Sequence, residues 1–235
     1  MKFLTLLTFI FLISKSSLAF NNEMFLKAGT NFSLNRLGVF EKEEPGSDDR
    51  GIAEHSYFGG FGFNTHFGYR WERYEFTISS TIVLGKVEDL SFVINENSFK
   101  GSGNYQNLMV SPTLRYFVPW KPLKEWRINL GTGPIWSQQT VRLKEFVSTG
   151  PFSGRNFKLT YDSVGWGISI GLEENLKYKE MHPVYVELSY VRLYSLRAYL
   201  VDTSDSTKSN VLSKSEAKKD VRAEALILSI GIVLF

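Results

Sequence analysis

Two consecutive runs of strict alternation constrain this chain more than any other feature. Residues 57–70 and 74–84 each alternate a bulky apolar residue with a small or polar one, and a three-residue break separates them. A period of two is typical of β-strands, and a short polar break between two such runs predicts a hairpin. Each run exceeds the roughly 9–11 residues that a tilted strand needs to cross a bilayer.

The composition of the two faces indicates which one is outside. A soluble lipocalin-like barrel also alternates, with its apolar face turned inward. Here the polar face is crowded with Gly, Ser, Thr and Asn, which suit a narrow lumen. The apolar face ends in the aromatic residues Tyr57, Tyr69 and Tyr74, as bilayer interfaces favour. The hairpin therefore predicts a transmembrane β-barrel.

The first 19 residues have the pattern of a secretory signal peptide. Lys2 precedes an apolar core over residues 3–13, and Ser17-Leu18-Ala19 forms a small-x-small cleavage site. The apolar run is too short to span a bilayer as a helix. We expect two segments, a signal peptide over residues 1–19 and one barrel domain over residues 20–235.

Charge and cysteine content exclude several classes of function. Without Lys2 and Lys15 of the signal, 25 basic residues face 24 acidic ones, so the net charge of +1 argues against nucleic acid as a partner. The absence of cysteine excludes a disulfide framework, a lipoprotein anchor, a thiolate nucleophile and a cysteine-based metal site. We expect a monomer.

The rest of the chain continues the alternation and predicts eight strands in all. Three connections are short, and four are long, at residues 36–54, 86–104, 141–157 and 201–219; residues 90–94 could extend the second hairpin above the membrane. Short turns on one side and long loops on the other are the topology of outer-membrane barrels. Closure of the barrel pairs the edge strands, whose free N–H and C=O groups would be costly in lipid. The predicted fold is an all-β, eight-stranded, antiparallel, up-and-down barrel, with strands near residues 24–35, 57–70, 74–84, 105–118, 126–139, 159–176, 184–200 and 221–235.

Two predicted strands contain a proline. Pro112 and Pro134 lie inside the fourth and fifth strands. Proline cannot donate to a β-ladder, so each predicts a bulge or a missing hydrogen bond.

The chain resembles the small OmpA/OmpX-type outer-membrane barrels over its whole mature length. The resemblance rests on the signal peptide, the eight alternating strands, the alternation of long and short connections, and the terminal Phe235. The resemblance implies the bacterial outer membrane as location, and the barrel-insertion machinery as a partner that reads the terminal aromatic residue. The last strand differs in one respect, because Phe235 has the opposite parity to its strongest apolar face. The family hosts adhesion, structural and small transport roles and a few lipid enzymes, so the fold does not give the function.

The three histidines provide no catalytic constellation. Residues two apart on a strand share a face, and neither His55 nor His66 has a nucleophile at such a position. Ser56 follows His55 directly and therefore faces the other way, and His182 lies in a predicted turn. We predict no catalytic residue, no cofactor and no metal site.

The charged residues with inward parity gather near the short-turn end. Four are basic and three are acidic, and an unpaired charge away from water is costly. Because an eight-stranded barrel is just wide enough for side chains to fill, they predict a salt-bridge layer that plugs the lumen. This lumen charge network comprises Lys27, Arg70, Glu75, Arg115, Arg127, Glu173 and Glu187.

Basic residues with outward parity follow the apolar band on the long-loop side. Such side chains bind phosphate well, or they form an ordinary snorkelling rim, and Glu88 and Asp162 share this rim. We predict outer-membrane lipid and lipopolysaccharide as partners, contacted by Arg36, Lys86, Arg142, Lys158 and Arg192.

Three functions remain open at this point. The favoured one is a non-catalytic outer-membrane barrel that stabilises the envelope or interacts through its extracellular loops. The alternative is an OmpW-type transporter of small hydrophobic molecules; the inward faces are too polar for this, although Pro112 and Pro134 could open the wall. A lipid-modifying enzyme is the third.

Overall fold

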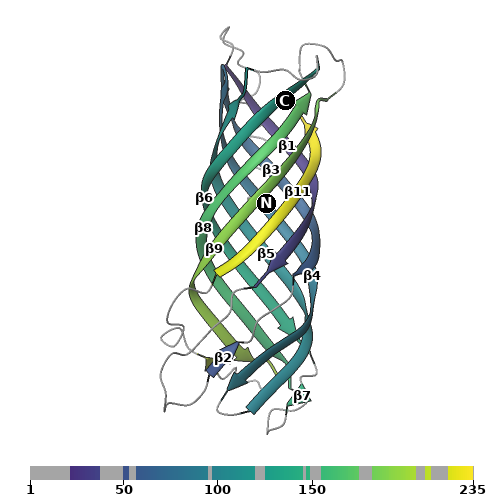
Figure 1. Cartoon of the computed structure of the whole chain (residues 1–235), viewed down its shortest axis with the longest axis vertical. Coiled ribbons are helices and arrows are strands. Elements are labelled where there is room, and N and C mark those ends of the chain that lie inside the picture. The colour runs from purple at the N-terminus through teal and green to yellow at the C-terminus, as the bar shows by residue number, and fades with distance from the viewer. Residues whose placement is uncertain are drawn as a thin grey trace, which may run out of the picture.

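Eight long antiparallel strands close into a barrel in the computed structural model (Figure 1). The structure describes residues 22–37, 50–52, 57–94, 97–119, 125–144, 147–148, 155–174, 182–204, 210–212 and 222–234. The predicted signal peptide and Phe235 lie outside these residues. The barrel strands are β1 (Asn22–Arg36), β3 (Phe58–Trp71), β4 (Tyr74–Ile94), β5 (Asn97–Phe117), β6 (Trp126–Leu143), β8 (Phe157–Glu174), β9 (Val184–Asp202) and β11 (Arg222–Val233).

Each barrel strand pairs with its neighbour in the chain, and β11 pairs with β1 to complete the wall. In the closing ladder Ala28 lies opposite Ile232 and Leu34 lies opposite Leu226, so the outward apolar residues of the two strands share one face. The predicted eight-stranded, up-and-down fold is confirmed. Within the described residues, no helix is long and apolar enough to cross a membrane.

Part of the wall continues beyond the bilayer at the long-loop end. β4 and β5 have 21 residues each, and they stay paired up to Ile94 and Asn97, with an irregularity between Val87 and Leu90. Most of the loop predicted over residues 86–104 is therefore an extension of the hairpin, as the alternative for residues 90–94 proposed. Three short strands, β2 (Arg50–Ile52), β7 (Val147–Ser148) and β10 (Asn210–Leu212), pair with β4, β5 and β9.

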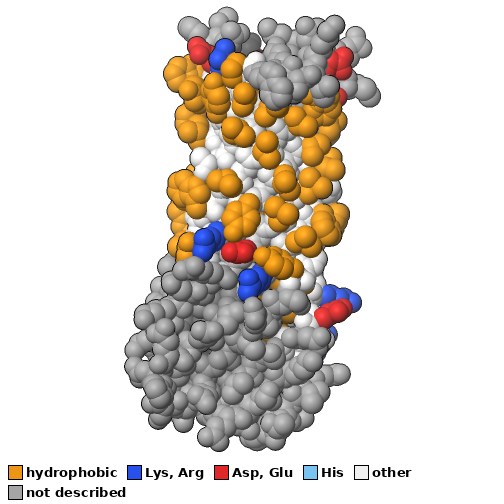
Figure 2. Space-filling view, viewed as in Figure 1, with side chains coloured by type: hydrophobic (Ala, Val, Ile, Leu, Met, Phe, Trp, Pro, Cys, Tyr) orange, Lys and Arg blue, Asp and Glu red, His pale blue; other side chains and the backbone are white. Residues whose placement is uncertain are grey.

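Apolar side chains are spread over the visible outer face of the barrel wall (Figure 2), and large hydrophobic residues are exposed on all eight barrel strands. Phe61, Phe63 and Ile78 expose 56–61% of their surface. Soluble proteins rarely expose an apolar patch of this extent to water. Lipid is the solvent that suits it, and a closed barrel satisfies the backbone inside a bilayer. The protein is an integral barrel of the bacterial outer membrane, with its short turns on the periplasmic side.

The interior is layered along the barrel axis. Beyond mid-membrane, inward side chains such as Val83, Val141, Leu159 and Leu193 are fully buried and belong to one apolar cluster. The expectation of a polar interior is wrong for this half, because the inward positions of β6, β8, β9 and β11 become apolar toward the long loops. Small polar residues occupy the middle, and charged residues occupy the periplasmic end.

Candidate functional site

The predicted lumen charge network draws its residues from seven of the eight barrel strands, all but β11. The ladder register places opposite charges side by side along the wall: Glu75 lies between Arg70 and Arg115, and Arg127 lies opposite Glu173. Arg127 retains some exposure, and the other six are buried. The pleat of the strands is what aims them all inward.

Ion pairs also cross the lumen. Lys27 Nζ lies 2.9 Å from Glu75 Oε1 and 2.7 Å from Glu173 Oε2. Arg70 Nη2 contacts the same two carboxylates at 2.8 and 2.7 Å, and Arg127 adds a 3.0 Å contact to Glu173. The two carboxylates and three cations therefore form one connected layer across the barrel.

Arg115 connects this charged layer to residues farther from the periplasmic end, among them Glu187 and His66. Its guanidinium, only 2% exposed, donates to Glu187 at 2.8 and 3.1 Å and to Glu75 at 3.3 Å. It also donates to Thr77 Oγ1 at 2.8 Å and to His66 Nδ1 at 3.1 Å. Its five N–H donors thus have five acceptors, as a buried guanidinium requires.

Aromatic rings cover the network. The Arg70 guanidinium lies 5.2 Å from the ring centre of Phe25 and 4.8 Å from that of Phe117, and the Arg127 guanidinium lies 4.7 Å from Phe117. Both rings are buried. Such contacts favour a desolvated cation. Sequence reasoning did not single out these two phenylalanines, although their inward parity could have identified them.

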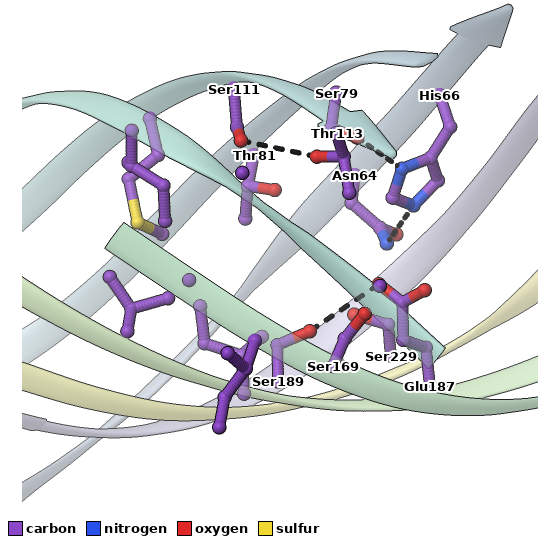
Figure 3. A pocket seen from close by; sticks show the side chains of 18 of the residues that line it. Asn64, His66, Ser79, Thr81, Ser111, Thr113, Ser169, Glu187, Ser189 and Ser229 are labelled. Carbon is purple, nitrogen blue, oxygen red and sulfur yellow. Dashed lines mark hydrogen bonds between the residues drawn. The ribbon is translucent and has the colours of Figure 1, made fainter. Parts of the chain in front are cut away.

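His66 has a hydroxyl partner on the next strand. Ser79 lies directly opposite it, with its Oγ 2.7 Å from His66 Nδ1 (Figure 3), and Nε2 lies 3.0 Å from the Asn64 amide. Sequence reasoning missed this pair because it considered only positions on one strand. Since a guanidinium can only donate, the contact from Arg115 engages the Nδ1 lone pair that a general base would need.

A small cavity lies above the charged layer (Figure 3). Its volume is about 70 Å³, and hydroxyl side chains such as Ser79, Ser189 and Ser229 line it, with Glu187 at its floor. This space suits a few water molecules and is too small for an acyl chain. Among the described residues, no group of three or more His, Asp and Glu could hold a metal ion.

The wall beside this cavity lacks part of its ladder. Between β5 and β6 the paired residues run to Val110 and Trp136, then resume at Leu114 and Thr132 in the same register. The missing rungs are centred where Pro112 would face Pro134. Neither proline has an N–H, so the prediction of a missing hydrogen bond is confirmed, and no register shift accompanies it.

Side-chain hydrogen bonds form beside the break in the backbone ladder. Ser111 Oγ donates to the Pro134 carbonyl at 2.7 Å. On the lipid face, the Trp166 indole donates to Thr132 Oγ1 at 2.6 Å. Thr132 and Ile168 have outward parity, and both line the cavity, so the cavity reaches into the wall at this break.

The remaining predicted residues lie on the outer face. Lys86, Arg142 and Lys158 are exposed, and Arg36 and Arg192 are half-buried. Figure 2 shows blue and red side chains where the apolar band ends. Arg36 and Arg192 both lie opposite Glu224, whereas Arg142 lies opposite Lys158, so the five residues do not form one site. His182 is exposed before β9, and His55 lies outside the described residues.

Comparison with known proteins adds little to the geometry. No protein-family model and no curated protein sequence matches the chain. Among solved structures, Neisserial surface protein A is 12% identical with a TM-score of 0.49, covering 91% of this chain and 98% of that one. OprG from Pseudomonas aeruginosa is 13% identical with a TM-score of 0.49, covering 90% and 94%. The outer-membrane protease OmpT from Escherichia coli is 9% identical with a TM-score of 0.49, covering 93% and 98%.

At these scores the three likenesses carry no argument about function. The assignment rests on the closed register, the apolar exterior and the alternation of short and long connections. The protein has the architecture of a small eight-stranded outer-membrane β-barrel.

Proposed function

We propose that this protein is a non-catalytic outer-membrane barrel with a sealed lumen, which stabilises the envelope or interacts through its extracellular part. The observation that carries this proposal is the lumen charge network, in which Glu75 and Glu173 share cations across the barrel. Ions or solutes passing through would have to separate buried pairs, at a cost of several kcal/mol per charge left unpaired.

Two further features support the proposal. The outer half of the lumen is filled by the apolar cluster that includes Val141, Leu159 and Leu193, so water meets a second obstruction there. Beyond the membrane, β2 and β7 flank the extended β4–β5 hairpin. This extension gives the protein an extracellular surface on which an interaction could act.

A liposome-swelling assay tests the sealed lumen. Vesicles that contain the purified protein are placed in an isotonic solution of a small sugar. We expect the swelling rate of protein-free vesicles, because the charge network and the apolar cluster obstruct the lumen. An open porin in matched vesicles provides the positive control, and swelling at a porin-like rate would refute the proposal.

One observation favours a second function, the OmpW-type transport of small hydrophobic molecules. The ladder break at Pro112 and Pro134 adjoins a cavity that reaches the outward residues Thr132 and Ile168. A transporter of this type would use such a break as its lateral route into the bilayer. Against it stand the small hydroxyl-lined cavity and the apolar cluster above it. We therefore rank this function second.

Restoring the missing donors separates the two functions. The double variant P112A/P134A supplies two N–H groups where the ladder is broken. If molecules leave through the wall, uptake of a small hydrophobic substrate into cells that depend on this protein should fall in the variant. Under the sealed-barrel proposal, uptake is equally low for wild type and variant. Heat-modifiable migration in gels confirms that both fold.

Biogenesis supplies a further proposed partner. We expect the barrel-insertion machinery to receive the chain, because the chain forms a closed outer-membrane barrel. Depleting that machinery should leave the protein unfolded in the periplasm, and normal assembly without it would contradict this expectation.

A further inference from the structure

Two like charges face each other on the outer surface of the barrel. Arg142 on β6 and Lys158 on β8 are directly opposite in the ladder, and both side chains are exposed. Like charges at this position destabilise a sheet unless something neutralises them. Within the described part of the chain, neither side chain has an acidic partner.

The pair belongs to a longer row across four strands. Arg142 lies opposite Asn104 on β5, and Asn104 lies opposite Lys86 on β4. Asn104 and Lys86 are exposed, and Lys86 also lacks an ion-pair partner among the described residues. With neighbouring strands about 4.8 Å apart, the row is about 14 Å long. It carries three positive charges and one amide.

The other two basic residues of the rim are arranged differently. Arg36 and Arg192 lie on either side of Glu224 in the ladder, so positive and negative charges alternate there. Tyr57 donates to Glu224 at 3.3 Å, and the Arg36 guanidinium lies 6.0 Å from the Tyr57 ring centre. This part of the rim has an acidic residue between its two basic ones, which the row lacks, and therefore serves as an internal control.

The row climbs away from the hydrocarbon. Lys86 is two residues beyond the outward-facing Leu84 of β4, whereas Arg142 and Lys158 are six residues beyond Trp136 and Val164. A rise of about 3.3 Å per residue on strands tilted by about 40° gives heights of about 5 Å and about 15 Å. Phospholipid headgroups occupy only about 5–8 Å on each side of the bilayer. The upper pair therefore lies above that layer.

An outer-leaflet glycolipid matches this geometry. We propose that the row Lys86, Asn104, Arg142 and Lys158 binds the phosphorylated saccharide of lipopolysaccharide. Lys86 meets anionic groups near the acyl chains, and Arg142 and Lys158 together bind an anionic group on the saccharide. Arginine and lysine are suited to this because both form charge-assisted hydrogen bonds with phosphate. A phospholipid headgroup would reach Lys86 but not the upper pair.

A pair of double variants tests the proposal with equal changes in net charge. R142Q/K158Q removes the upper pair, and R36Q/R192Q removes the two cations that flank Glu224 in the ladder. Binding of purified lipopolysaccharide to each folded protein in detergent is measured by titration, with heat-modifiability confirming the fold. We expect about tenfold weaker binding for R142Q/K158Q, since two contacts to a charged group are lost. R36Q/R192Q should bind as wild type does.

Three controls identify the ligand chemistry. Dephosphorylated lipopolysaccharide should bind wild type and R142Q/K158Q equally, and anionic phospholipid should not distinguish them. Millimolar inorganic phosphate should not displace lipopolysaccharide. Equal loss of binding in both double variants would indicate net charge alone and overturn the proposal, as would unchanged binding in R142Q/K158Q. The sealed-lumen proposal is tested by permeability and can fail independently.

Discussion

Glu75 and Glu173 lie on β4 and β8, two strands separated by β5 and β6 along the wall, yet both carboxylates contact the same two cations. Lys27 Nζ reaches them at 2.9 and 2.7 Å, and Arg70 Nη2 reaches them at 2.8 and 2.7 Å. Both glutamates are fully buried. This sharing joins opposite sides of the barrel, so the network should contribute to closure of the lumen and to stability of the wall.

Neutralising Glu75 should destabilise the barrel. E75Q leaves Lys27, Arg70 and Arg115 with one carboxylate fewer, and removing one partner of a buried ion pair costs about 3–5 kcal/mol. Urea unfolding in lipid vesicles, followed by tryptophan fluorescence, gives the free energy of unfolding. The exposed Glu88 on the same strand provides the control, since E88Q should change stability by less than about 0.5 kcal/mol. Equal effects of the two changes would contradict a structural role for the network.

The apolar half of the lumen makes a separate contribution. Leu193 on β9 points inward and is fully buried, whereas Leu188 on the same strand is 42% exposed on the lipid face. L193A should cost about 2–5 kcal/mol because the packed interior cannot close the cavity. L188A should cost less, since lipid fills the vacated space. The same unfolding assay compares them, and a larger loss for L188A would mean that this half of the lumen is loosely packed.

The shortest periplasmic turn is strained at Glu72. Trp71 pairs with Tyr74 across a two-residue turn, and Glu72 has a φ of 52°, the one positive value among the described non-glycine residues. A side chain costs about 1–2 kcal/mol in this left-handed region. E72G should therefore stabilise the barrel by about 1 kcal/mol. R73G, at the neighbouring position without positive φ, should destabilise it, and the opposite order would contradict the assignment of strain.

A pH-sensitive contact lies outside the membrane, at the outer end of β9. Burial tends to raise the pKa of Asp202, but hydrogen bonds from Arg155 and from the Ser204 amide, each 2.8 Å, outweigh it and lower the pKa. A depressed pKa contributes stability above the unfolded value near 4 and loses it as pH falls through the folded value. The NMR signal of the Ser204 amide should shift below about pH 4, and D202N should abolish this shift. A signal that is independent of pH would contradict the contact.

The fold was predictable because alternation along a strand fixes which side chains face the lumen. Lys27, Glu75 and Glu187 could be assigned inward by parity alone, and the crowding of charges near the short turns was visible in the sequence. The ion-pair partners of these residues were not visible in the sequence, since Lys27 contacts Glu173 across the lumen and not along the wall. Such contacts depend on barrel closure and stagger, which no single strand encodes.

Register was the other quantity that one sequence did not provide. Pro112 and Pro134 each predicted a missing bond, but their alignment in one ladder depends on the length of the connection between β5 and β6. The same holds for His66 and Ser79, which meet only across a strand pair. The five rim cations could be assigned outward by parity. Their division into a pair that flanks Glu224 and a row without an acidic residue appeared only once the strands were paired.

The sealed lumen is tested most directly by electrical recording of the purified protein in planar lipid bilayers. We expect the wild-type protein to insert without steady discrete currents, because the buried charge network and the apolar cluster obstruct the lumen. Replacing Glu187, whose carboxylate contacts Arg115 at 2.8 Å, with alanine should destabilise the barrel or admit small flickering currents. Large, steady single-channel currents from the wild-type protein would contradict a sealed barrel.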